Sequence, residues 1–282
     1  MAQQNLIIGG FTNYGINELK PWVLSINEKM PDAHKVMCVG NASVETREWL
    51  VQQGFELVPI SESPMPIHVL RFFAIYDYLK NNYEKFKYVV TTDVKDVYFQ
   101  ADPFELIDAI CSNSGFKLIL ASEGLKYKDE PWGNDNLMQS YGPYIYDEFK
   151  DNEIYNVGTF GGLAEYVKDM VFHIFTNAIN RPIQICDQAV FNVLVNTLPF
   201  ADVCYPTDDW ACEAGTVADP TKIESFRPNL TCDEPTLKEG LVYYRDYLFP
   251  IVHQYDRVPE WKKIVQERYG QDDDSLFFKY KT

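Results

Sequence analysis

Short apolar runs alternate with segments of helical spacing along the first 121 residues. Three of the apolar runs are predicted to be strands, at 6–8, 35–39 and 55–60. The segments between them are predicted helices, and Gly54 follows the second one, where glycine commonly ends a helix. Strands that alternate with helices build a mostly parallel sheet covered by helices on both faces. The pattern therefore predicts an α/β fold.

The next predicted helix, at about 68–82, is apolar on nearly all sides, which is typical of a buried helix. It contains Arg71, and a buried guanidinium needs an anionic partner or several acceptors. The strand that follows runs directly into Asp93. Asp102 and Pro103 are predicted to be the N-cap and the first residue of the helix after it.

The pattern is less regular in the second half of the chain. Residues 122–152 are rich in Tyr, Gly, Pro and Asp and are predicted to be irregular, and a long irregular stretch in a compact domain usually carries function. Order resumes at 153–158, and Gly161 and Gly162 are predicted to lead into a helix. Further along we predict a helix at 187–198, a loop-rich stretch at 199–240, a strand at 241–244 and a last helix from about Pro259.

Composition narrows the class of protein. The chain has 282 residues, of which 46% are hydrophobic, and this suits one large α/β domain over 1–282. Its formal charge of −16 would repel DNA or RNA, so no nucleic-acid partner is expected. The first residues lack the basic region of a signal peptide, so none is expected, and no apolar run reaches the roughly 20 residues that a membrane span needs. Its six cysteines lack zinc-like spacing, so we expect reduced thiols, no transmembrane segment and a cytoplasmic location.

Two carboxylates, Asp93 and Asp96, give the strongest chemical signal. They lie where a buried strand ends and a loop begins, and two carboxylates three residues apart on a turn can converge on one hard cation. Such a cation would neutralise a diphosphate and stabilise its charge as it leaves. The alternative is an Asp turn, in which each carboxylate accepts hydrogen bonds from backbone N–H groups.

The segment from Tyr88 to Phe104, with its Asp-Val-Lys-Asp motif and the later Asp-Pro, resembles the GT-A class of glycosyltransferases. In that class a strand runs into an Asp-x-Asp motif that holds Mn²⁺ or Mg²⁺ and the donor diphosphate. The resemblance implies a GT-A-like sheet, a nucleotide-binding half at 1–121 and a half for the donor sugar and acceptor at 122–282. The spacing departs from Asp-x-Asp, which leaves the choice of principal ligand open; Asp96 is favoured for the metal, with Asp93 as a second ligand or a ribose contact.

The same resemblance implies roles for two distant side chains. GT-A enzymes often supply a late metal ligand from a C-terminal segment, and His253 has that place; a core or surface histidine is the alternative. An arginine on the helix before the metal-binding strand often meets the nucleotide or donor sugar, which is the place of Arg71. The alternative for Arg71 is a structural ion pair with one of the site's own carboxylates.

Two short motifs resemble the GT-A elements that hold the donor sugar. The Asn-x-Gly turn at Asn156 and Gly158 exposes backbone N–H groups, although a tight turn into a helix would look the same. Asp187, followed by Gln188, stands at a helix start, where Asp is also a preferred N-cap. Ligands of such sheets bind beyond the carboxyl ends of the strands, which predicts nucleotide contacts in the first loop, at Gly9, Phe11, Thr12, Asn13 and Tyr14.

These features together predict a metal-dependent glycosyltransferase that uses a nucleotide-sugar donor, with UDP favoured, and a carbohydrate or other hydroxyl acceptor. Arg71, Asn156 and Asp187 are its expected catalytic side chains. Six loop carboxylates are candidate bases, and the absence of a single clear base favours retention of configuration; they are Glu123, Asp129, Asp135, Asp208, Asp209 and Glu213. Loop aromatics are candidates for the acceptor side, namely Tyr127, Trp132, Tyr141, Tyr144, Tyr146 and Trp210.

Two other functions remain open from the sequence. A nucleotidyltransferase that makes nucleotide sugars should carry basic residues in its first glycine-rich loop, and residues 9–15 have none. A carbohydrate-binding or degenerate transferase domain would share the fold and the aromatic loops without catalysis. Metal-dependent binding of a nucleotide sugar separates this second alternative from the main prediction.

Overall fold

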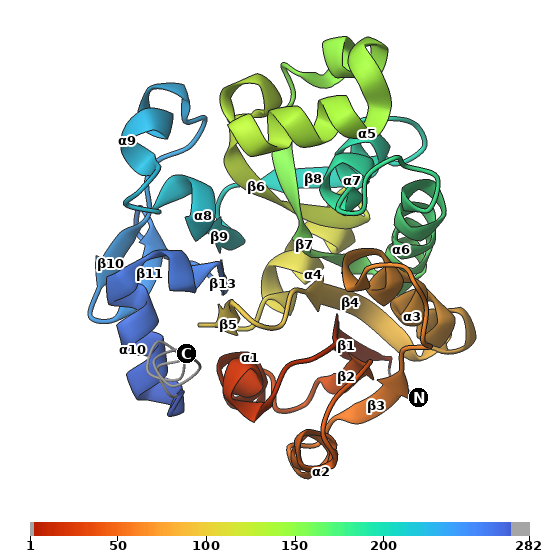
Figure 1. Cartoon of the computed structure of the whole chain (residues 1–282). Coiled ribbons are helices and arrows are strands. Elements are labelled where there is room, and N and C mark those ends of the chain that lie inside the picture. Colours follow the sequence, from red (N-terminus) through yellow and green to blue (C-terminus); the bar gives the residue numbers. More distant parts are fainter. Residues whose placement is uncertain (1–2, 272–282) are drawn as a thin grey trace, which may run out of the picture.

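A seven-stranded sheet forms the centre of the protein in the computed structural model, which describes residues 3–271 (Figure 1). Its strands stand in the order β3 (Glu56–Pro59), β2 (His34–Val39), β1 (Gln4–Phe11), β4 (Phe86–Thr92), β7 (Glu153–Leu163), β6 (Leu118–Lys126) and β8 (Cys204–Thr207). β7 runs antiparallel to both of its neighbours, and every other pair is parallel. The prediction of a mostly parallel sheet is confirmed.

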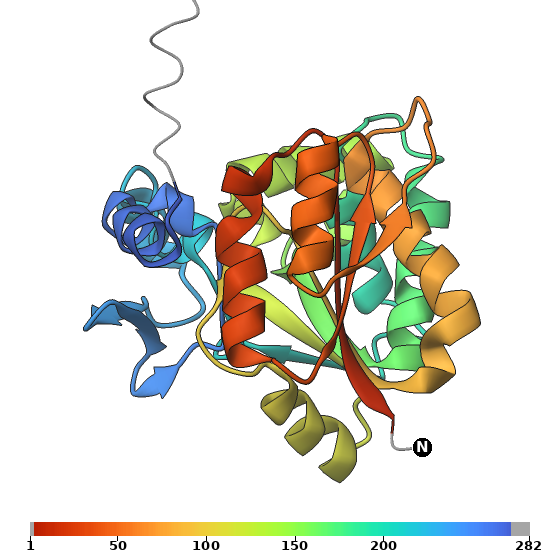
Figure 2. The ribbon, with the colours of Figure 1, turned by 90° about the horizontal axis from the view of Figure 1, so that it is seen from below.

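Helices cover both faces of this sheet (Figures 1 and 2). One face packs against α1 (Ile16–Lys29), α2 (Val44–Gln52) and α4 (Phe104–Asn113). The other packs against α3 (Ile67–Asn82), α6 (Ala164–Ala178) and α7 (Asp187–Val195). Successive side chains of a strand point to opposite faces. Ile7 of β1 therefore lies in the hydrophobic core on the side of α1, α2 and α4, while Leu6 and Ile8 lie in the core on the side of α3, α6 and α7. Apolar runs rather than alternating patterns mark these strands because both faces are buried.

Two small sheets lie beside the main one. One contains β5 (Val97–Phe99), β13 (Ile251–His253) and β9 (Ala211–Glu213), and the other contains β10 (Thr236–Lys238), β11 (Leu241–Tyr244) and β12 (Tyr247–Leu248). Three helices belong to this part of the chain: α8 (Ala214–Val217), α9 (Ile223–Phe226) and α10 (Pro259–Tyr269). Within residues 3–271, no helix combines the length and the apolar character that crossing a membrane requires.

The stretch predicted to be irregular is mostly ordered, which corrects that prediction. β6 continues to Lys126, and α5 (Pro131–Phe149) follows it. The side chain of Glu130 caps α5 by accepting hydrogen bonds from the backbone N–H groups of Trp132 and Gly133. Gly142 has a φ of 79° and interrupts the helix, so the glycine and proline that suggested a loop mark a kink instead.

Of two smaller predictions at element boundaries, one is corrected and one is confirmed. α4 begins at Phe104, one residue later than expected, with Asp102 accepting a hydrogen bond from the Phe104 N–H at 2.8 Å. Gly161 and Gly162 lie near the end of β7 and are followed after Leu163 by α6, so they lead into a helix as predicted. A Cβ atom on Gly162 would lie 2.1 Å from the Lys117 carbonyl oxygen, so glycine is needed here because strands pack closely.

Candidate active site

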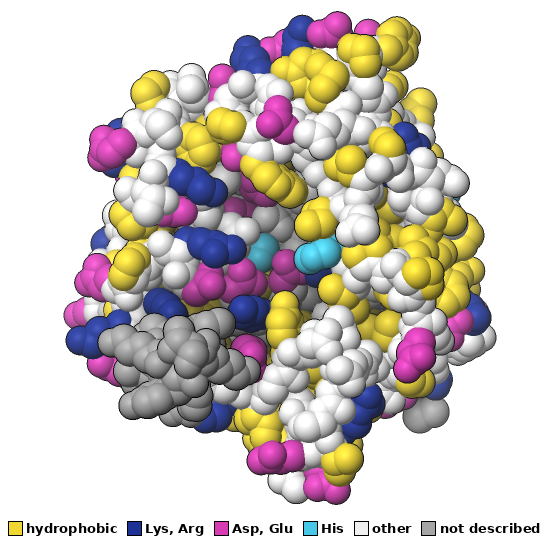
Figure 3. All heavy atoms as spheres, viewed as in Figure 1, with side chains coloured by type: hydrophobic (Ala, Val, Ile, Leu, Met, Phe, Trp, Pro, Cys, Tyr) yellow, Lys and Arg dark blue, Asp and Glu magenta, His cyan; other side chains and the backbone are white. Residues whose placement is uncertain are grey.

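A cavity of about 630 Å³ opens at the carboxyl ends of β1 and β4. Figure 3 shows this face hollowed, with histidine side chains in the hollow and acidic and basic side chains around it. Most of the residues predicted for the site line the cavity: Phe11, Thr12, Tyr14, Arg71, Asp93, Asp96, Asn156, Gly158, Asp187 and His253. Residues from both halves of the chain therefore meet at one place, as ligand sites in open α/β sheets do.

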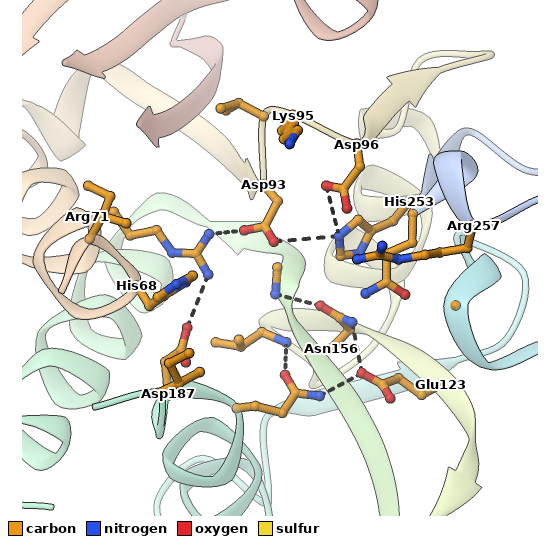
Figure 4. Close-up of a pocket in the computed structure, with 18 of the residues that line it drawn as sticks. His68, Arg71, Asp93, Lys95, Asp96, Glu123, Asn156, Asp187, His253 and Arg257 are labelled. Atoms are coloured by element: carbon orange, nitrogen blue, oxygen red, sulfur yellow. Dashed lines mark hydrogen bonds and ion pairs between the residues drawn. The ribbon is translucent and has the colours of Figure 1, made fainter. Parts of the chain in front are cut away.

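Asp93, Asp96 and His253 come together at the centre of this cavity (Figure 4). Nε2 of His253 lies 3.6 Å from Oδ2 of Asp93 and 3.6 Å from Oδ1 of Asp96. Strand register explains the meeting, because His253 pairs across β13 and β5 with Val97, the residue directly after Asp96. The three side chains each offer one ligand atom, and these atoms lie within 4.8 Å of one another.

The other nitrogen of His253 is held by Glu213. Nδ1 lies 2.6 Å from Oε2 of Glu213, and both side chains are buried. Burial alone would lower the pKa of His253, but the Glu213 carboxylate outweighs it and, with Asp96, raises that pKa to about 9. Nε2 of His253 is buried and has no hydrogen-bond partner among the described residues. A buried imidazole nitrogen that faces two carboxylates fits a divalent cation, with Glu213 orienting the ring.

Gly158 packs directly against Asp93. Its carbonyl oxygen accepts a hydrogen bond from the Asp93 N–H at 2.8 Å. A Cβ atom at position 158 would lie 2.8 Å from Oδ2 of Asp93 and 2.9 Å from Oδ1 of Asn156. The glycine predicted to admit a ligand therefore also admits the Asp93 carboxylate to the surface of β7.

Arg71 links the metal-ligand cluster to Asp187. Its Nη1 forms an ion pair with Oδ1 of Asp93, and its Nη2 lies 3.3 Å from Oδ2 of Asp187. Arg71 is buried on α3, and Asp187 is buried at the start of α7. Arg71 thus forms the ion pair with carboxylates of the site that was one of its two predicted roles. The same contacts hold its guanidinium in the cavity wall.

Asn156, Gln188 and Glu123 form a hydrogen-bonded network on the next part of the wall. Oε1 of Glu123 accepts hydrogen bonds from Nδ2 of Asn156 at 2.8 Å and from Nε2 of Gln188 at 2.7 Å. The two amide oxygens accept from the backbone of β7, with Oδ1 of Asn156 bonded to the Gly158 N–H and Oε1 of Gln188 to the Val157 N–H. Burial raises the pKa of Glu123 to about 8, and the neighbouring carboxylates Glu213 and Glu130 add to that rise.

The architecture around this site is shared with a solved glycosyltransferase. No protein-family model matches the chain, and neither does any curated protein. The structure is similar to that of the galactosyltransferase LgtC in complex with donor and acceptor sugar analogues, with a TM-score of 0.54 and 12% sequence identity. The likeness covers 97% of this chain and 99% of that one. The chain has a GT-A-like fold.

In this GT-A-like fold three of the five residues predicted from the first loop line the cavity. Phe11, Thr12 and Tyr14 line the cavity, but Gly9 and Asn13 do not. A Cβ atom on Gly9 would lie 2.4 Å from Cγ1 of Val94, so glycine at this position allows the Val94 side chain to pack against β1. Asn13 has a φ of 62° and bonds to Asn41, which makes it part of the turn between the strand ends.

One of the predicted aromatics and several residues that were not singled out from the sequence also line the cavity. Of the loop aromatics, Trp132 lines the cavity, while Trp210 is buried and donates its indole N–H to the Pro103 carbonyl. His68 lies beside Arg71 and Asp187 in Figure 4 and was not among the predicted site residues. Further polar groups line the cavity from the C-terminal segment and the loops before it: Thr216, Asp219, Lys222, Gln254 and Arg257. Arg257 follows His253 by four residues, so its closeness in sequence to a predicted metal ligand could have marked it as a candidate site residue.

Proposed function

We propose that the protein is a glycosyltransferase that moves a sugar from a nucleotide-diphosphate sugar, with UDP favoured, to a hydroxyl of a glycan or other acceptor. One observation carries the proposal: Asp93, Asp96 and His253 converge in the main cavity of a GT-A-like fold, and the buried Nε2 of His253 faces both carboxylates. The likeness to LgtC, which was solved with donor and acceptor sugar analogues, supports the same class of reaction.

Mn²⁺ or Mg²⁺ is the proposed cofactor, held by Asp93, Asp96 and His253. Two carboxylate oxygens and one imidazole nitrogen suit Mn²⁺ well, because imidazole is a softer ligand than Mg²⁺ prefers. A bound cation supplies neutralisation of the charge that develops on the leaving diphosphate. Lys95 and Arg257 line the same part of the cavity and add positive charge for the phosphates.

The two halves of the chain take different parts of the donor in this proposal. Phe11, Thr12 and Tyr14, at the end of β1, contact the nucleotide. Asp187 accepts hydrogen bonds from sugar hydroxyls, with Arg71 fixing its carboxylate. The wall formed by Asn156 and its neighbours closes the sugar site on the side of β7.

Group transfer then needs a hydroxyl close to the anomeric carbon. The acceptor oxygen forms a bond to that carbon, the bond from the carbon to the diphosphate oxygen breaks, and its electron pair leaves with the diphosphate. Holding both substrates against one wall lowers the entropy cost of this step. Trp132, at the cavity edge, offers an apolar face on which an acceptor sugar can pack.

A donor screen tests the proposal without knowledge of the acceptor. Purified protein is incubated with Mn²⁺ and UDP-glucose, UDP-galactose, UDP-N-acetylglucosamine or GDP-mannose, and slow release of the nucleoside diphosphate is measured. We expect hydrolysis of at least one donor, lost when a chelator removes the metal. Pyrophosphate release from a nucleoside triphosphate and a sugar phosphate, without donor hydrolysis, would identify a nucleotidyltransferase instead and would overturn the proposal.

A further inference from the structure

Glu123 presents one carboxylate oxygen that the protein does not use. It lies on β6 and lines the cavity beside Asn156 (Figure 4). Both amide donors, from Asn156 and Gln188, go to the same oxygen, Oε1. No side chain or backbone group within residues 3–271 hydrogen-bonds to Oε2. The side chain is therefore fixed in orientation while half of its accepting capacity remains open.

The positions of the other candidate carboxylates exclude them as the catalytic base. Four of the six carboxylates suggested by the sequence do not line the cavity: Asp129, Asp135, Asp208 and Asp209. Glu213 is buried and holds His253. Only Glu123 of this set lies in the cavity wall.

The remaining carboxylates of the cavity have other partners. Asp187 pairs with Arg71, and both oxygens of Glu130 cap α5. Asp219 accepts from the backbone and hydroxyl of Thr221 through Oδ1, and within residues 3–271 its side chain has no hydrogen bond to Asn156 or to the metal-ligand cluster. Asp93 and Asp96 belong to the proposed metal site, where a cation would compete for any proton.

Glu123 is also joined to the metal-ligand cluster through β7. Asn156 donates to Glu123 and accepts from the Gly158 N–H, and the Gly158 carbonyl accepts from the Asp93 N–H. Three hydrogen bonds thus connect the carboxyl group to the place where the diphosphate would be held. Glu123 and the metal-ligand cluster line the same cavity, so a donor held by the cluster would share that space with a hydroxyl that contacts Glu123.

We propose that Glu123 is a catalytic base that takes the proton of the attacking hydroxyl. As the hydroxyl oxygen forms its bond to the anomeric carbon and the carbon–diphosphate bond breaks, the proton moves to Oε2 of Glu123 and the electron pair leaves with the diphosphate. In donor hydrolysis a water molecule takes the place of the acceptor hydroxyl and gives its proton to Glu123 in the same way. This role rests on the proposed transferase function. Because the pKa of Glu123 is raised to about 8, its ionised carboxylate is a stronger base than an ordinary one, and the ionised fraction grows as the pH rises towards 8 and above.

Glu123→Gln tests the role with little change of shape. The amide oxygen of glutamine can still accept from Asn156 and Gln188, while its NH₂ group replaces the accepting oxygen Oε2. With Mn²⁺ and the donor that the wild type hydrolyses fastest in the panel, we expect the single-turnover rate of hydrolysis to fall about 100-fold. The dissociation constant of the donor should stay within about twofold. Asp208→Asn, the same chemical change outside the cavity, should leave the rate unaltered.

Azide as an alternative nucleophile distinguishes a catalytic base from a residue that only supports the structure. Azide ion carries no proton, so its attack on the anomeric carbon needs no base and gives a glycosyl azide. In Glu123→Ala we expect hydrolysis to be lost and glycosyl azide to form at a rate close to that of the wild type. Loss of both reactions to the same extent would overturn the role, as would wild-type hydrolysis in Glu123→Gln. A wild type that hydrolyses no nucleotide sugar would contradict the transferase function itself, a result that needs no variant.

Discussion

Glu213 and His253 form a buried hydrogen bond, with Oε2 and Nδ1 at 2.6 Å. The two residues are paired across β9 and β13, so the sheet itself fixes their register. Because a carboxylate can only accept, the proton lies on Nδ1, and Nε2 is directed at Asp93 and Asp96. Glu213 thereby orients the ring for metal binding without touching the metal.

Removal of the Glu213 charge should weaken the metal site. In Glu213→Gln we expect the affinity for Mn²⁺ to fall about 10-fold to 100-fold, because an orienting partner of a metal-bound imidazole typically contributes that much. Titration of Mn²⁺ followed by electron paramagnetic resonance measures the change. Glu234→Gln, at an exposed carboxylate paired with Arg227, is the control and should bind Mn²⁺ like the wild type. Equal affinities in all three proteins would refute the orienting role.

Metal binding should release a proton from His253. Its pKa is raised to about 9 in the metal-free protein, so the ring is protonated at neutral pH and must lose the Nε2 proton to bind a cation. Affinity for Mn²⁺ should therefore rise about tenfold per pH unit between about pH 6 and about pH 8. Calorimetry in buffers of different ionisation enthalpy counts the released protons, with about one expected near neutrality. A pH-independent affinity in this range would contradict the assignment of His253 as a ligand.

Gly158 should be intolerant of a methyl group. The Cβ of Gly158→Ala would lie 2.8 Å from Oδ2 of Asp93, so the carboxylate must move out of the cluster. We expect Mn²⁺ affinity and donor hydrolysis each to fall by about tenfold or more, since sites tolerate only small misplacement. Gly115→Ala is matched in chemistry and meets no atom within 4 Å, so it should behave like the wild type. Normal metal binding by Gly158→Ala would show that Asp93 is not a ligand.

Arg71 should matter for both stability and activity. Arg71→Met leaves Asp187 buried without its cationic partner, and breaking a buried pair from one side costs about 3–5 kcal/mol. Urea unfolding should show a loss of that order, and donor hydrolysis should be lost as well. Arg227→Met, at a surface ion pair, should leave the unfolding midpoint almost unchanged. A fully stable Arg71→Met that lacks activity would mean that the arginine serves the substrate alone.

The sequence predicted the sheet and the three-residue cluster for different physical reasons. Apolar runs alternating with helical patterns predicted the parallel sheet, because burial on both faces leaves that signature. Asp93 was predicted from its place at a strand end, and His253 from a resemblance in motif order. The structure brings both to one cavity with Asp96.

Other features depend on contacts between distant segments and leave little trace in the local pattern. The pairing of Glu213 with His253 joins strands that are 40 residues apart in the chain. α5 was missed because its Gly142 and Pro143 resemble loop residues, and because its N-cap is Glu130 rather than the Ser, Thr, Asp or Asn that most often begins a helix. Gly9 and Asn13 were predicted as ligand contacts because a turn and a binding loop use the same residue types.

The most direct test of the central claim is calorimetric titration of UDP into the protein with and without Mn²⁺. The account predicts that UDP binds the wild type only when Mn²⁺ is present, and that Asp96→Asn and His253→Ala lose this binding while remaining folded by circular dichroism. Asp129→Asn, a carboxylate outside the cavity, should bind UDP as the wild type does. Equal binding of UDP in the absence of metal, or undiminished binding by both variants, would contradict a metal site at Asp93, Asp96 and His253.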